Sequence, residues 1–130
     1  MERTVRILLV EDNLINQKVM GQILSKLPAV SLESVESGED ALELLCRERF
    51  DLVLMDLQLE GMSGIEAVRR IRELSDSATP RSVVVVILSG YSDREQQRLA
   101  TLAGADGYML KPVDTQLLAQ LIEQVRSSTI

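Results

Sequence analysis

Hydrophobic residues along this chain form two alternating patterns: short unbroken runs, and longer segments in which they recur every three or four positions. The runs are typical of buried strands and the longer segments of amphipathic helices. We expect strands at residues 5–10, 30–35, 52–56, 82–89 and 107–110. We expect helices at about residues 14–27, 37–49, 63–74, 92–103 and 114–125. Strands that alternate with helices in this way predict a doubly wound α/β fold, with a parallel sheet between two layers of helices.

The run at residues 52–56 is the centre of the predicted fold. Its first four residues are all apolar and leave the strand without a polar face, so it suits a position buried beneath helices on both sides of a parallel sheet. Asp56 ends this run. An aspartate after a strand is by itself most often a turn former or a helix cap, so its role has to be judged together with its neighbours.

Polar groups stand at the ends of four of the predicted strands. Glu11 and Asp12 follow the first strand, Asp56 ends the third, Ser89 ends the fourth and Lys111 follows the fifth. The carboxyl ends of parallel strands lie at the same edge of a sheet, so we expect these side chains to share one rim. In the flavodoxin-like strand order 2-1-3-4-5, the first and third strands are neighbours and the three carboxylates meet.

This set of groups suits phosphoryl chemistry. Three close carboxylates repel one another unless a cation lies among them, and a few oxygen ligands favour Mg²⁺, with Mn²⁺ as a substitute. Lys111 and Ser89 suit the oxygens of a phosphoryl group, which Asp56 can attack as an ionised carboxylate to form an aspartyl phosphate. Each residue also has a plainer interpretation, since Asp12 can cap a helix, Ser89 can end a strand and Lys111 can be solvated. Their joint placement at four strand ends favours the site.

Length and composition indicate one ordinary domain. The chain has 130 residues, 45% of them hydrophobic, which is enough for a core without disulfides, so we expect a single domain over residues 1–130, whether complete or excised from a longer protein. The single cysteine, Cys46, lies in an apolar pattern and is predicted to be a buried or half-buried thiol. We find no apolar run long enough for a membrane span and no secretory signal, and we therefore expect a cytoplasmic domain without membrane contact.

Charge and the absence of histidine exclude other classes. The net charge is −6 and the sequence has no cluster of Lys and Arg, so direct contact with nucleic acid is not expected. Histidine is absent from the chain, which removes the Ser-His nucleophile pairing and the usual nitrogen ligand of zinc. The chemistry must therefore rest on carboxylates, hydroxyls and lysine.

The motifs in their order resemble the receiver domain of two-component response regulators. VEDNLINQKV matches the acidic opening, MDLQLEGMSGIEAVRRIR resembles the phosphoacceptor block, ILSG resembles the hydroxyl-bearing strand end, and GADGYMLKP matches the closing block. The resemblance covers nearly the whole chain. The VEDNxxNQ opening is most similar to receivers of hybrid sensor histidine kinases, and in such a protein the kinase activity would lie outside this chain.

The resemblance implies a role for each residue of the rim. Asp56 would be the phosphoacceptor, in a domain that catalyses its own phosphorylation and slow dephosphorylation rather than in a turnover enzyme. Ser89 and Lys111 would hold the phosphoryl oxygens. The Mg²⁺ ligands would be the side chains of Asp12 and Asp56, the side chain of Glu11 directly or through water, and the backbone carbonyl of Gln58.

The resemblance also implies a switch, in which the Ser89 hydroxyl moves toward the phosphate and Tyr108 turns inward. As a hypothesis, Gln58 and Tyr91, two positions beyond Asp56 and Ser89, tune the lifetime of the phosphoryl group. Two positions depart from the family pattern. Glu60 stands where proline is usual, which puts the rigidity of the loop in question, and Ser63 stands where aspartate is usual.

The implied partner is a histidine kinase or a histidine phosphotransfer domain, and the implied interaction surface is the last two helices with the last strand. We expect a monomer or a weak dimer through those helices. The alternative is a receiver that no longer accepts phosphate and acts as a protein interaction module. A phosphatase that uses an aspartyl phosphate is a weaker rival, because the position two residues after Asp56 is Gln58 rather than an acid. The sequence contains neither GxxxxGK nor GxGxxG, which disfavours a nucleotide-binding module.

Overall fold

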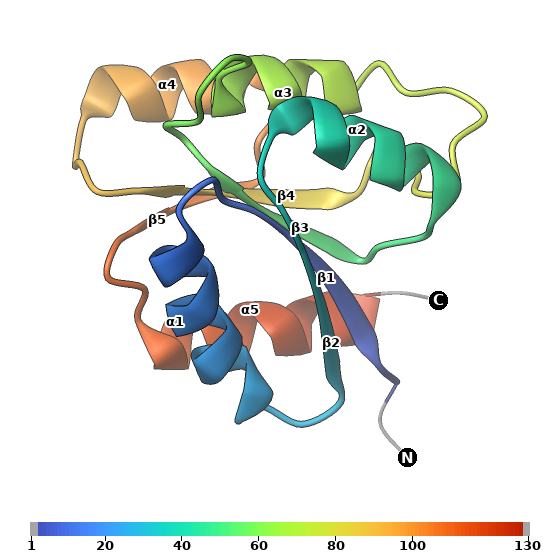
Figure 1. The fold of residues 1–130 in the computed structure, drawn as a ribbon, viewed down its shortest axis with the longest axis vertical. Helices are drawn as coiled ribbons and strands as arrows, with labels where there is room; N and C mark the ends of the chain where they lie inside the picture. Colours follow the sequence, from blue (N-terminus) through green and yellow to red (C-terminus); the bar gives the residue numbers. More distant parts are fainter. Residues whose placement is uncertain (1–2, 129–130) are drawn as a thin grey trace.

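Five parallel strands in the order β2-β1-β3-β4-β5 form one sheet in the structure, a computed structural model that describes residues 3–128 (Figure 1). The strands are β1 (Val5–Val10), β2 (Val30–Val35), β3 (Leu52–Asp56), β4 (Val84–Ser89) and β5 (Gly107–Leu110). This is the predicted doubly wound order. It places β3 between β1 and β4, so the strand that ends on Asp56 is central and all five of its residues are buried.

The helices cover the two faces of the sheet. They are α1 (Leu14–Ser25), α2 (Gly38–Arg47), α3 (Gly64–Ile71), α4 (Arg94–Ala103) and α5 (Thr115–Ser128). Figure 1 shows α2, α3 and α4 on one face, with α1 and α5 on the other. Within residues 3–128, none of the helices combines the length and apolar composition that crossing a bilayer requires.

Alternate residues of each central strand supply the two cores. On β3, Val53 and Met55 pack beneath α2, α3 and α4, whereas Leu52 and Leu54 pack beneath α1 and α5. Side chains on neighbouring positions of a strand point to opposite faces, so a strand buried on both faces must be apolar throughout. This burial fixes the register of β3 and with it the place of Asp56 at the rim.

Side-chain caps set the start of each helix. The Ser37 and Ser63 hydroxyls accept the N–H groups three residues on, and Asp114 accepts the N–H groups of the first turn of α5. The cap of α4 is Asp93 rather than Ser92, the first residue of the predicted helix, and Asp93 Oδ1 lies 2.9 Å from the Glu95 nitrogen. The first three helices also end two or three residues earlier than predicted.

The burial of some apolar residues differs from the sequence interpretation. Cys46 is exposed, so the prediction of a buried or half-buried thiol was wrong. Leu102 and Leu117 are also exposed, although both are apolar residues of helices that the sequence predicted as amphipathic. The only buried residues of α4 are two alanines, Ala100 and Ala103, so this helix is lightly packed.

Candidate functional site

Three carboxylates converge at the carboxyl ends of β1 and β3. Asp56 is the last residue of β3, and Glu11 and Asp12 directly follow β1, the neighbouring strand. One carboxylate oxygen of each lies within 4.8 Å of the others. Glu11 and Asp56 are buried, whereas Asp12 is partly exposed. The structure therefore brings together the acidic residues that the sequence assigned to one rim.

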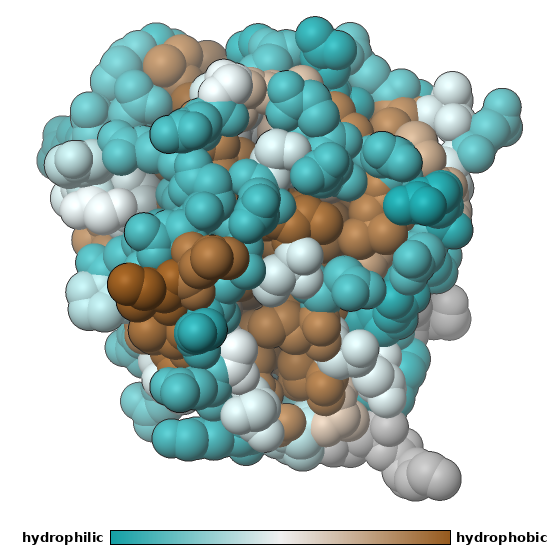
Figure 2. All heavy atoms as spheres, viewed as in Figure 1, coloured by the Kyte–Doolittle hydropathy of each residue, from teal (hydrophilic) through white to brown (hydrophobic). Residues whose placement is uncertain are grey.

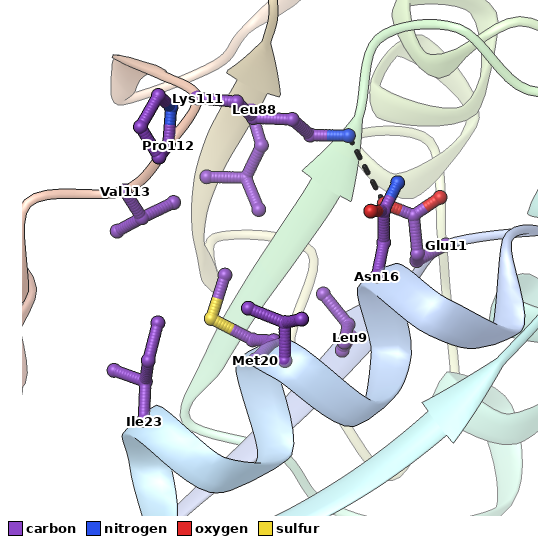
Figure 3. A pocket seen from close by; sticks show the side chains of 10 residues that line it. Leu9, Glu11, Asn16, Met20, Ile23, Leu88, Lys111, Pro112 and Val113 are labelled. Carbon is purple, nitrogen blue, oxygen red and sulfur yellow. Dashed lines mark hydrogen bonds and ion pairs between the residues drawn. The ribbon is translucent and has the colours of Figure 1, made fainter.

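Lys111 crosses from the end of β5 to this acidic group. Its ammonium nitrogen lies 3.0 Å from Glu11 Oε1 and 3.3 Å from Asp56 Oδ1. Figure 3 shows the lysine side chain extending over Leu88 toward Glu11. The Lys111 backbone N–H donates to the Ser89 carbonyl at 2.7 Å, which fixes the buried end of β4 beside it. Four strand ends thus contribute to one site.

Backbone N–H groups from the adjoining loops orient all three carboxylates. The Asn13 N–H donates to Glu11 and the Gln58 N–H donates to Asp56, both at 3.2 Å. The Glu60 N–H donates to Asp12, also at 3.2 Å. The last of these bonds bears on a departure from the family pattern, since a proline at position 60 has no N–H to donate. Glu60 therefore links the loop after β3 to the loop after β1.

The site shifts the pKa values of its ionisable groups. Burial, followed by the hydrogen bond and charge of Glu11, raises the pKa of Asp56 from 3.8 to about 6, although the charge of Lys111 opposes this. Burial also acts to raise the pKa of Glu11, but hydrogen bonds from Lys111 and Asn13 outweigh it and lower that pKa. Burial acts to lower the pKa of Lys111, but both carboxylates outweigh it and raise that pKa, so the amine stays charged at neutral pH.

Gly64 brings α3 close to the backbone of Asp56. A β-carbon at this position would lie 2.4 Å from the Asp56 carbonyl oxygen, well inside any van der Waals contact. The Gly64 N–H also donates to the Leu57 carbonyl at 3.2 Å. With Ser63 capping the helix, the start of α3 therefore holds the backbone on which the Asp56 side chain stands. Only glycine permits this approach.

The donor set fits a hard divalent cation. All three side chains offer carboxylate oxygens, and Glu11, Asp12, Asp56 and Lys111 together carry a net charge of −2 when ionised. Mg²⁺ is commonly held by one or two carboxylates together with water and a phosphate oxygen. The partly exposed position of Asp12 leaves one side of the group open toward solvent.

The Ser89 hydroxyl is hydrogen-bonded to the loop after β4. Ser89 Oγ accepts the Tyr91 N–H at 3.1 Å and donates to the Tyr91 carbonyl at 3.4 Å. The Tyr108 hydroxyl donates to the same carbonyl at 3.2 Å. Tyr108 is half-buried, whereas Tyr91 and Gln58 are exposed. The carbonyl of Tyr91 thus links the two residues that the sequence assigned to a switch.

An apolar cavity of about 350 Å³ adjoins the site between α1 and the segment after β5. Figure 3 shows Met20 and Ile23 on one side of it and Val113 on the other, with Glu11 and Lys111 at one end. Beside it, α1 exposes three large apolar side chains, and Figure 2 shows hydrophobic atoms gathered where α1 lies. They are Leu14, Ile15 and Val19. The helical spacing predicted α1 but not this exposed face, because the apolar positions span more than one side of the helix.

Comparisons with known proteins place the chain among related domains. A family model described as "Response regulator receiver domain" matches residues 7–123. A cyclic di-GMP phosphodiesterase of Thermotoga maritima is 41% identical over 112 residues, which cover 86% of this chain and 28% of that protein. The sensor protein GacS of Pseudomonas syringae is 33% identical over 120 residues, covering 92% of this chain and 13% of that protein. The chain therefore spans much less than half the length of these curated relatives.

Solved structures of receiver domains are also similar. The receiver domain of a Pseudomonas aeruginosa sensor histidine kinase, solved with a magnesium ion in its active site cleft, is 30% identical with a TM-score of 0.84. The match covers 96% of this chain and 99% of that one. A receiver domain of Saccharomyces cerevisiae, crystallised with a histidine phosphotransfer protein, is also 30% identical, with a TM-score of 0.79. That match covers 97% of this chain and 91% of that one.

Proposed function

Because this chain belongs to the response regulator receiver domains of two-component signalling, we propose that it accepts a phosphoryl group on Asp56 from a phosphohistidine. Its relatives include a hybrid signal transduction histidine kinase of Dictyostelium discoideum. The observation that carries the proposal is the convergence of Glu11, Asp12, Asp56 and Lys111 at one rim of the sheet. The chain has no histidine, so the donor must be another protein or a region outside these residues.

Asp56 acts as the nucleophile. Its pKa of about 6 leaves most of the carboxylate ionised at neutral pH, so it needs no separate base. An oxygen of Asp56 forms the new bond to phosphorus while the phosphorus–nitrogen bond of the phosphohistidine breaks. The electron pair of the broken bond returns to the imidazole nitrogen. The other ring nitrogen carries a proton, so the donor is left with a neutral histidine side chain. The product is an aspartyl phosphate.

Lys111 and Ser89 hold the phosphoryl oxygens. The Lys111 ammonium, already 3.3 Å from Asp56 Oδ1, offsets the negative charge on the phosphoryl group. To donate to the phosphoryl group, the Ser89 hydroxyl must give up the bond that it donates to the Tyr91 carbonyl. The Tyr108 hydroxyl donates to the same carbonyl, so phosphorylation at Asp56 alters contacts on the outer side of β5. This is the proposed switch, a shift toward a state that only the phosphoryl group stabilises.

Three carboxylates and one carbonyl would hold Mg²⁺ in this site, with Mn²⁺ as a substitute. They belong to Glu11, directly or through water, to Asp12 and Asp56, and to the backbone of Gln58. The ion supplies positive charge that offsets the carboxylates and the incoming phosphoryl oxygens. The related Pseudomonas aeruginosa receiver, with magnesium in its active site cleft, supports this assignment.

The proposed donor is a histidine kinase or a histidine phosphotransfer domain. The related yeast receiver crystallised with a histidine phosphotransfer protein supports this class of partner. A donor that reaches Asp56 must cover the adjoining rim, where α1 exposes Leu14, Ile15 and Val19. Burial of such side chains by a partner is favourable at roughly 25 cal/mol per Å² of apolar surface. This face adds to the predicted surface on α4, β5 and α5, where Leu102, Leu110 and Leu117 are exposed.

We further propose that residues 1–130 form one receiver domain that works in the cytoplasm. One sheet and its two cores include elements from Val5 to Ser128, which supports a single unit. Any histidine kinase activity would lie in a separate region or protein. The self-association expected through α4 and α5 is weak, so size-exclusion chromatography should show a monomer at low protein concentration.

Intact mass spectrometry tests the phosphoacceptor. After incubation with Mg²⁺ and acetyl phosphate, the wild-type chain should gain one phosphoryl group, and EDTA should prevent the gain. Asp56→Asn should gain none. The matched control is Asp40→Asn, which removes an exposed carboxylate from α2 and should behave as the wild type. No gain in the wild type would favour the phosphorylation-independent interaction module, and repeated release of phosphate would indicate a turnover enzyme.

A further inference from the structure

The strand β2 forms an open edge of the sheet. Among the strands of residues 3–128 it pairs with β1 alone, in an unbroken register of six residues. The Val35 carbonyl accepts the Glu11 N–H, so Val35 turns its main chain toward β1. Alternate residues of a parallel strand bond the same neighbour, so every second residue of β2 turns its main chain away from the sheet. These outward groups are the N–H and C=O groups of Val30, Leu32 and Ser34.

The features that commonly block such an edge are missing from β2. Natural sheets protect their edges with proline, lysine, bulges or very short strands. The sequence of β2 is VSLESV, and its residues pair one to one with those of β1 without a bulge. Figure 1 shows β2 in front of the other strands, and Figure 2, from the same side, shows hydrophobic atoms along it. This edge can therefore pair with a further strand.

A hollow lies on each side of the edge. The one beside α1 has a volume of about 190 Å³ and is largely apolar, with Leu24, Val30 and Leu32 in its lining. The one beside α2 has a volume of about 420 Å³, and its lining carries three carboxylates and one guanidinium, a net charge of −2 when all are ionised. They belong to Glu36, Asp40, Glu43 and Arg47. One side of the edge is thus apolar and the other acidic.

A strand added to this edge would face both hollows. Val30 and Leu32 pack against the core beneath α1, whereas Val35 packs against the core beneath α2. Successive side chains of a strand point to opposite faces of a sheet, so an added strand would direct its side chains by turns to the apolar and the acidic side. Glu33 is exposed on the acidic side and adds a further negative charge there. The complementary strand therefore alternates apolar with basic residues.

We propose that the edge of β2 binds an extended segment of another protein in which apolar and basic residues alternate. The outward main-chain groups supply hydrogen bonds to the segment, and the two hollows select its side chains. A second copy of this chain is the poorer occupant. Two β2 strands paired about a twofold axis would bring Glu33 and the acidic hollow close to their own copies, in a chain whose net charge is −6.

Hydrogen exchange measured by NMR tests the open edge. The probe is the synthetic peptide RVKVRV, blocked at both ends, and its matched control is EVEVEV. In the free chain the three outward amides should exchange faster than the amides of Ser31 and Glu33, which face β1. At a peptide concentration of about ten times the dissociation constant, RVKVRV should slow exchange of the outward amides about tenfold. EVEVEV should leave their exchange unchanged.

Two variants separate the main-chain bonds from the charge. Ser34→Pro removes an outward N–H at an exposed edge position, where proline is tolerated, and should weaken binding of RVKVRV at least about fivefold. Ser34→Ala keeps that N–H and should bind as the wild type. If Ser34→Pro folds poorly, Glu33→Lys should weaken binding at least about threefold through its charge. Glu73→Lys, which makes the same charge change at an exposed position after α3, should not.

Three results would overturn the proposal: exchange that RVKVRV leaves unchanged, equal protection by EVEVEV, or undiminished binding in both Ser34→Pro and Glu33→Lys. Protection of the outward amides that rises with protein concentration in the absence of peptide would also overturn it, because a second copy would then be the occupant. The measurements contain neither Mg²⁺ nor a phosphodonor. Their outcome is therefore independent of the proposed phosphoryl transfer.

Discussion

Replacing Asp56 by asparagine should change how stability depends on pH. The pKa of Asp56 is raised from 3.8 to about 6 by burial and by Glu11. Between these two values the folded state binds more protons at this carboxyl than the unfolded state does. The free energy of unfolding therefore falls as the pH rises through this window. Asp56→Asn removes the group that titrates, so the variant should not show this part of the fall.

The size of the effect follows from the pKa. Each pKa unit is worth about 1.4 kcal/mol, so ionising Asp56 in the folded state costs about 3 kcal/mol once the pH is well above 6. Between about pH 5 and about pH 8, the linkage relation gives about 1.4 kcal/mol of that cost. The stability of Asp56→Asn relative to the wild type should increase by this amount over the interval.

Urea unfolding at a series of pH values, in EDTA, measures this difference. The difference between the two free energies of unfolding at each pH removes the contribution of ionisable groups that both proteins share. Asp40→Asn is the control, since it removes an exposed carboxylate that is not part of the acidic group, and its difference from the wild type should stay flat. A stability difference for Asp56→Asn that is constant between pH 5 and 8, or that changes in the opposite direction, would refute the reasoning.

Three further predictions concern the same rim. Mg²⁺ at about ten times its dissociation constant should stabilise the wild type by about 1.4 kcal/mol in urea unfolding, and Asp12→Asn should lose most of this gain; equal gains in both proteins would remove Asp12 from the ligand set. Gly64→Ala should lower the free energy of unfolding by more than about 2 kcal/mol, because its methyl group would collide with the Asp56 carbonyl, and a shift within about 0.5 kcal/mol would contradict that contact. Tyr91→Ala should speed the loss of radiolabelled phosphoryl group in a chase, and an unchanged decay would remove Tyr91 from the control of its lifetime.

The sequence predicted the strand order and the shared rim because both follow from simple rules. Uninterrupted apolar runs indicated buried parallel strands, and parallel strands place their carboxyl ends together. Glu11, Asp56 and Lys111 could therefore be assigned to one site before any distance was known. The individual bonds could not be predicted, because the 3.0 Å contact between Lys111 and Glu11 depends on the path of a loop.

The errors arose where local signals were ambiguous. Ser92 and Asp93 are adjacent cap formers, and only the backbone path shows that Asp93 reaches the free N–H groups of α4. Leu102 and Leu117 lie near the boundary between the apolar and polar faces of short helices, where periodicity does not decide burial. Cys46, which the apolar pattern LELLC suggested to be buried, is likewise exposed on α2. The Tyr91 carbonyl accepts two hydroxyl groups, and this could not be predicted because every residue has a backbone carbonyl.

The hydrogen bond from residue 60 to Asp12 is donated by the main-chain N–H. Every amino acid except proline has this N–H, so the identity of the side chain does not affect the bond. Proline alone lacks the donor and must restrain the loop through its ring instead. One residue cannot supply both the N–H donor and the restraint of a proline ring. With glutamate at this position, a main-chain hydrogen bond joins the two loops, and the exposed Glu60 side chain takes no part in that bond.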